Sequence, residues 1–216
     1  MSDIFREVDE EIRQENYARL WKRYGSYAIG FAVLLVAAVA GYQIGQGYDL
    51  QRRTELSDRY AVVTDQILED QDDAAQATLA EIADPSDSGY GTLAAFTRAQ
   101  LLADAGSTAE ATAIWDRIAE QSPSGDSFRA IATLLSVMHQ LDSGDPAVLA
   151  PRLEPLMAAG QAFRTSAQEL DALLAIKQGD SDRPRARLEA IGQDIFAPPA
   201  ARERAAQLLA TLQTGE

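Results

Sequence analysis

One stretch of the chain carries no charged residue over 24 positions, from Gly25 to Tyr48. Its centre, residues 28–40, is almost wholly apolar. A hydrocarbon layer about 30 Å thick is crossed by about 20 helical residues, each rising about 1.5 Å. Within lipid, a single segment satisfies its own backbone polar groups only as a helix. Residues 25–48 are therefore predicted to form one transmembrane helix.

Two other interpretations of this stretch fit the sequence less well than a membrane span. A buried helix of a soluble core is disfavoured because such helices rarely run this long without a charge. Cleavage of a signal peptide is disfavoured because six acidic residues precede the stretch, although Ala38-Val39-Ala40 resembles a cleavage site. The sequence favours an uncleaved anchor.

The basic residues that flank the stretch predict its orientation. Five precede it, and three of them lie close to its start: Arg19, Lys22 and Arg23. Three more follow it closely, before a long interval without any basic residue. The positive-inside rule then places the N-terminus in the cytoplasm and exports the rest of the chain. Aromatic and basic side chains at the inner boundary are expected to anchor the helix at the interface: Trp21, Lys22, Arg23 and Tyr24.

Small residues recur every four positions along the predicted span, at Ala37, Gly41 and Gly45. This spacing lets two membrane helices approach closely, so these residues are candidates for packing against another helix. The alternative is that glycine and alanine are simply common in membrane helices.

Residues 1–24 are predicted to form an amphipathic cytoplasmic helix. Ile4, Val8 and Ile12 are four residues apart and so share one helical face. Two roles fit this pattern equally: a helix that lies on the inner leaflet, and a helix that docks on a membrane partner.

The composition excludes several classes of function for the remaining residues, 49–216. This part holds 27 acidic and 14 basic residues, and a chain so acidic lacks the basic footprint of a nucleic-acid binder. The whole chain has no cysteine and one histidine, which excludes thiolate metal sites and multi-histidine metal sites. No nucleotide-binding or hydrolase motif is present. We expect no enzyme activity and no cofactor.

Helical stretches alternate with short Gly, Pro, Asp and Ser breaks from residue 49 onward, and no strand pattern is found. The predicted fold is all-α: an N-terminal helix and one transmembrane helix, followed by a solenoid of stacked antiparallel helix pairs. The expected helices cover residues 52–70, 73–83, 92–105, 108–121, 127–142, 147–159, 162–177, 183–191 and 200–212.

One unit fits the tetratricopeptide pattern of turn, small, aromatic, apolar and closing proline residues. These positions are Gly106, Ala111, Trp115, Ile118 and Pro123. Small residues let paired helices approach, and large ones fill the space between them.

Two residues on the first helix of this unit, Phe96 and Gln100, lie where such repeats usually face a binding groove. They are the candidate partner contacts, although Phe96 fits a core position equally well.

The chain as a whole resembles the YfgM-like proteins, which are ancillary subunits of the bacterial SecYEG translocon. The resemblance rests on the overall organisation and on two motifs, residues 5–10 (FREVDE) and residues 20–25 (LWKRYG). It implies a periplasmic repeat domain anchored in the inner membrane, associated with the Sec translocon and linking exported chains to periplasmic chaperones. The alternative function is a structural accessory subunit that stabilises another inner-membrane complex, such as a respiratory or envelope assembly.

Overall fold

The computed structural model describes residues 3–84 and 89–214, without the side chains of residues 3–21, 25, 26, 28, 32 and 214. All regular elements in the described part of the chain are helices, so the predicted all-α fold is confirmed. The chain separates into two compact units, residues 1–54 and residues 55–216, which are considered in turn.

The first unit consists of the N-terminal part of helix α1 (Asp3–Leu68), which is unbroken. The predicted leader, the uncharged stretch and the helix expected from residue 52 are therefore one element. Gly45 and Gly47 do not interrupt it, and a Cβ atom added at either would meet nothing within 4 Å.

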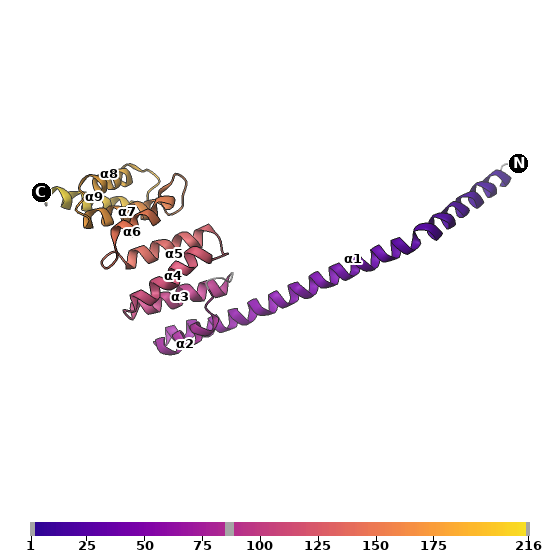
Figure 1. Ribbon diagram of the computed structural model, residues 1–216, viewed down its shortest axis with the longest axis horizontal. Helices are drawn as coiled ribbons and strands as arrows, with labels where there is room; N and C mark the ends of the chain where they lie inside the picture. The colour runs from indigo at the N-terminus through magenta and orange to yellow at the C-terminus, as the bar shows by residue number, and fades with distance from the viewer. Residues whose placement is uncertain (1–2, 85–88, 215–216) are drawn as a thin grey trace. The chain divides into compact units, whose positions relative to one another are not determined.

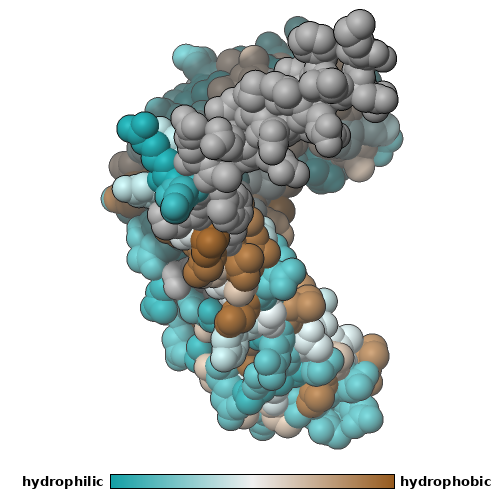
Figure 2. Space-filling model, turned by 90° about the vertical axis from the view of Figure 1, so that its right-hand side faces the viewer, coloured by the Kyte–Doolittle hydropathy of each residue, from teal (hydrophilic) through white to brown (hydrophobic). Residues whose placement is uncertain are grey.

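The uncharged stretch of α1 is not covered by other parts of the described chain. Phe31 and Leu34 are each 68% exposed, and the described side chains from Val33 to Tyr48 are all exposed. Figure 2 shows hydrophobic residues, in brown, exposed on the side of the molecule that faces the viewer. The interpretation as a buried core helix is therefore wrong. By length and composition, the part of α1 that begins at Ile29 is able to cross a membrane.

The second unit is a stack of helices in chain order (Figure 1). Its elements after α1 are α2 (Asp72–Ile82), α3 (Tyr90–Asp104), α4 (Thr108–Gln121), α5 (Asp126–His139), α6 (Pro146–Leu153), the 3₁₀ turn η1 (Glu154–Met157), α7 (Arg164–Lys177), α8 (Asp182–Gln193) and α9 (Pro199–Thr214). From α2 onward, each helix packs against the next, as expected for a solenoid of helix pairs.

Four apolar clusters follow one another along this stack, and each joins three successive helices. They contain, in order, Val63 with Leu79, Trp115 with Ile118, Leu153 with Leu174, and Leu188 with Ile191. Helices α3, α5 and α7 each contribute to two clusters, one on either side. No single pair buries its apolar surface alone, so the stability of each pair depends on its neighbours.

Glycine is required at two of the turns for different reasons. Gly106 ends α3 with φ +82°, and the amide of Ser107 bonds back to the Leu102 carbonyl, which is a Schellman C-cap. At Gly144 the constraint is space, because an added Cβ would lie 2.8 Å from the Leu149 Cδ1 atom and 2.9 Å from the Gln140 carbonyl oxygen. This turn therefore brings the start of α6 against the end of α5.

The predicted helix over residues 147–159 is shorter in the structure. Helix α6 ends at Leu153, and the 3₁₀ turn Glu154–Met157 replaces its last turn. The reason lies in Pro155, which has no N–H to donate to the carbonyl four residues earlier, while its ring crowds that carbonyl. Short 3₁₀ turns commonly take over where an α-helix ends.

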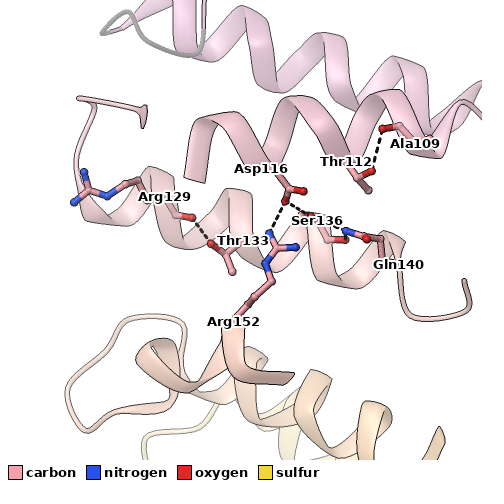
Figure 3. A network of polar contacts seen from close by, with 8 residues as sticks. All are labelled: Ala109, Thr112, Asp116, Arg129, Thr133, Ser136, Gln140 and Arg152. Carbon is pink, nitrogen blue, oxygen red and sulfur yellow. Dashed lines mark hydrogen bonds and ion pairs between the residues drawn. The ribbon is translucent and has the colours of Figure 1, made fainter. Parts of the chain in front are cut away.

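A polar network ties three helices of the stack together (Figure 3). The carboxylate of Asp116 on α4 accepts a hydrogen bond from the Ser136 hydroxyl on α5, with an Oγ–Oδ1 distance of 2.5 Å. The same carboxylate forms an ion pair with Arg152 on α6. The amide nitrogen of Gln140 donates to the Ser136 hydroxyl at 2.9 Å. The network fixes the position of α6 relative to α4 and α5.

Candidate protein-interaction face

Helix α5 carries two apolar stripes, and the second is only partly used by the core, through Leu135. The core stripe contains Ala130, Leu134 and Val137, and Leu141 continues it just after the helix. The second stripe is spaced by three, four and three residues and contains Phe128, Ile131, Leu135 and Met138. Residues at this spacing share one helical face. Helix α5 therefore presents an additional apolar face beside its core contacts.

This second stripe borders a hollow of about 430 Å³, here called the α5–α7–α9 groove. Helix α5 contributes Ile131, Leu134, Leu135 and Met138 to its wall, and Leu141 follows just after the helix. The segment that enters and forms α7 contributes Phe163, Ser166, Glu169, Leu170 and Leu173, and α9 contributes Arg204. The groove is thus an apolar channel with one polar edge, the usual chemistry of a binding cleft.

Four apolar residues of the groove belong to none of the four core clusters in the described chain: Ile131, Met138, Phe163 and Leu173. Met138 is 44% exposed. These apolar side chains lie outside the core and line one channel. A partner that covers them gains about 25 cal/mol of binding free energy per Å² of apolar area removed from water. The groove is the strongest candidate for a contact surface.

One ion pair forms the polar edge of the groove. The Nε and NH2 atoms of Arg204 donate to the two carboxylate oxygens of Glu169, at 2.7 and 2.8 Å. This bidentate hydrogen bonding, together with the negative charge of Glu169, raises the pKa of Arg204 above its ordinary value. Glu169 and Arg204 are the two charged residues that line the groove, and their charges cancel.

Phe96 and Gln100, the predicted partner contacts, both lie on α3. Phe96 is half-buried and packs against the cluster around Trp115, and its ring centroid lies 6.1 Å from that of Phe128. Gln100 is exposed, and its side-chain nitrogen donates to Asp104 at 3.0 Å. Phe96 on α3 therefore contacts Phe128, the first residue of the second stripe of α5. Contact of these two residues with a partner stays a prediction.

Two ion pairs elsewhere in the stack join neighbouring helices. Asp171 on α7 is 3% exposed and accepts a hydrogen bond from the Arg187 Nε on α8 at 2.9 Å. Arg152 on α6 is paired with Asp116 on α4. A buried, paired carboxylate mainly fixes the packing of its helices.

The residues predicted to anchor and pack α1 are placed on its surface. Lys22, Arg23 and Tyr24 are exposed, and the Arg23 guanidinium lies 5.8 Å from the centroid of the Tyr24 ring. The side chain of Trp21 lies outside the described residues. Ala37, Gly41 and Gly45 are exposed, and an added Cβ at either glycine would meet nothing within 4 Å. Their packing against a second helix stays a prediction.

Two polar residues of the stack, Asp180 and His139, have structural roles. Asp180, which belongs to a cluster of acids before α8, accepts hydrogen bonds at its Oδ1 from the amides of Asp182 and Arg183, and so caps α8. His139 stacks against Trp115, with ring centroids 4.7 Å apart. Within residues 3–84 and 89–214, no group of three or more His, Asp or Glu side chains is arranged to hold a metal ion.

The groove residues were missed in the sequence because only the best-matching repeat was used to choose contacts. The signal on α5 is weak, because this helix packs into two clusters and needs apolar residues on both sides, so Ile131 and Met138 resemble core positions in the sequence. Met138 and Leu173 come from adjacent repeats, and the packing of α5 against α7 is what brings them together.

Comparison with known proteins gives one match. The family described as "Tetratricopeptide repeat-like domain" matches residues 18–195. No curated protein and no solved structure matches the chain.

Proposed function

The chain belongs to the tetratricopeptide repeat-like domain family, and on this basis we propose that it is a protein-interaction module tethered to a membrane by α1. The observation that carries the proposal is the apolar face shared by α3, α5 and α7, which holds side chains outside the core clusters. Stacked helical repeats present extended faces of this kind to other proteins. The role is binding rather than catalysis.

The finer assignment places the module in the bacterial inner membrane, with its N-terminus in the cytoplasm and its repeat unit in the periplasm. The basic residues before the uncharged stretch support this orientation. The motifs at residues 5–10 and 20–25 support an accessory role at the Sec translocon, in which the repeat unit passes exported chains to periplasmic chaperones. The Sec translocon, the lipid bilayer, exported polypeptides and periplasmic chaperones are the proposed partners.

Purification in mild detergent of the full chain and of residues 1–54 tests the proposal. Mass spectrometry of the co-purified proteins is expected to find a membrane complex with both proteins, because docking at the membrane uses α1. Exported polypeptides or chaperones are expected only with the full chain.

The alternative, a structural accessory subunit, predicts a different pattern. Fixed subunits of one complex would then co-purify both with the full chain and with residues 1–54. The full chain would capture no additional protein through its repeat unit. A full chain that captures only those subunits would contradict the interaction-module proposal. The untethered residues 55–216 serve as the matched control for binding that needs no membrane.

A further inference from the structure

Helix α5 meets the helices that follow it along one stripe of apolar side chains, here called the contact stripe. It contains Leu134 and Val137, with Leu141 just after the helix. Among the described residues buried in this cluster, Val137 alone comes from α5, and α6 and α7 supply the others. The α3–α5 part of the stack therefore joins the α6–α9 part through a narrow apolar contact.

A hollow lies on each side of the contact stripe. One is the α5–α7–α9 groove of about 430 Å³, and the other is a polar hollow of about 440 Å³. The polar hollow is lined by Asp116, Ala119 and Glu120 of α4, Thr133 of α5 and Arg152 of α6. Thr133 is two positions from Ile131 and from Leu135 in the groove wall, and residues two apart point to nearly opposite sides of an α-helix, since each residue turns it by about 100°. Leu134 and Val137 point between these two directions, so neither hollow is filled by the contact stripe.

An ion pair closes the polar side of this joint. It links Arg152 on α6 to Asp116 on α4, and the two side chains are 27% and 38% exposed. The Glu169–Arg204 pair of the groove does not cross the joint, because both residues belong to the α6–α9 part. Loss of the Asp116–Arg152 pair therefore loosens the polar side of the joint and leaves the ion pair of the groove intact.

We infer that the α6–α9 part rocks on α5 about the contact stripe, and that the Asp116–Arg152 ion pair is the latch that holds one position. Rocking closes one hollow as it opens the other, because the two lie on opposite sides of the stripe. With the latch broken, the polar hollow widens and the α5–α7–α9 groove narrows. The loop between α5 and α6, residues 140–145, absorbs the change in backbone angles, as connecting loops do in hinge motions. The motion goes beyond the function proposed above, whereas its use to control the groove rests on that function.

Distances between two nitroxide labels in the full chain, held in nanodiscs of phosphatidylcholine, test the inference. The chain has no cysteine, so two introduced cysteines carry the only labels. Ala113→Cys with Val148→Cys reports the polar side. Ala113 lies three residues before Asp116, and Val148 lies four residues before Arg152, so each label shares a helical face with one member of the latch. Both positions are exposed.

A second pair of labels, Gln100→Cys with Gln207→Cys, reports the groove side. Gln100 shares a face of α3 with Phe96, which contacts the second stripe of α5, and Gln207 lies three residues after Arg204 on α9. Both glutamines are exposed. Rocking is expected to change the two label distances in opposite directions, whereas a general loosening of the stack would lengthen both.

Substitution of Arg152→Gln is expected to lengthen the polar-side distance and to shorten the groove-side distance, each by more than about 2 Å, the size of ordinary loop and domain rearrangements. The control is Arg59→Gln, which breaks an ion pair with Glu81 between α1 and α2 and is expected to leave both distances unchanged. The exchange of Asp116→Arg with Arg152→Asp rebuilds the pair with reversed charges and is expected to restore both distances.

Three results would overturn the inference: unchanged distances in Arg152→Gln, changes of both distances in the same direction, or a failure of the charge exchange to restore them. These measurements use no partner protein, so none of the three affects the co-purification that tests the interaction-module proposal.

Discussion

Replacement of Leu34 and Val36 with arginine is expected to release the chain from the membrane fraction. Both residues lie within the uncharged stretch of α1, and they are 68% and 66% exposed. In a membrane their side chains face lipid or a partner helix. Each arginine near the centre of a span costs about 2.5–3.5 kcal/mol of insertion free energy. Two such substitutions make insertion of this single span unfavourable.

Alkaline extraction of membranes, followed by detection of the full chain, measures this effect. The matched control is the pair Leu34→Ala and Val36→Ala, which removes the same side chains without adding charge and is expected to stay in the membrane pellet. An N-terminal tag retained on the mature protein distinguishes an uncleaved anchor from a signal peptide. Recovery of the double-arginine variant in the extracted pellet would contradict the span.

Truncation of Trp115 to alanine is expected to cost about 3–5 kcal/mol of unfolding free energy. Trp115 is 0% exposed and sits in the cluster that joins α3, α4 and α5. Its loss leaves a cavity between two helix pairs, so the coupling between these neighbours weakens as well. Phe196→Ala is the control, because Phe196 is 88% exposed and its removal leaves no cavity.

The Trp115→Phe variant separates the packing of the ring from its polar group. No acceptor in the described residues is bonded to the Trp115 Nε1. Phenylalanine removes this buried donor and keeps part of the ring volume, so its cost is expected to fall well below that of alanine. Urea unfolding of the full chain in mild detergent, followed by circular dichroism at 222 nm, measures all three variants. Equal stabilities of Trp115→Ala and Phe196→Ala would contradict the assigned core.

Much of the fold was predictable because local signals and packing agree. The helix expected over residues 108–121 has the same bounds in the structure, since a turn glycine precedes it, a proline follows it and its core stripe has helical spacing. Asp180 accepts hydrogen bonds from the first amides of α8, as aspartates placed before a helix commonly do. The helix predicted over residues 147–159 ends earlier, at Leu153. Pro155 has no N–H to donate to the helix, so the α-helix stops there although the apolar pattern continues.

The groove was less predictable because it depends on contacts between repeats. A stripe of apolar residues in one helix does not say which neighbour covers it, and residues 131–141 supply both a core stripe and a groove wall. Phe96 shows the same ambiguity, since it packs against the core on one side and against Phe128 on the other. Such assignments need the positions of the neighbouring helices.

Photo-crosslinking in intact cells tests most directly whether this chain is a membrane-tethered module that binds proteins through the face of α3, α5 and α7. A benzophenone side chain replaces Met138 in the groove or, as the control, Val148 outside it, in the full chain. We expect adducts with exported polypeptides from position 138 and none from position 148. Equal adducts from both positions, or adducts from position 148 alone, would contradict it.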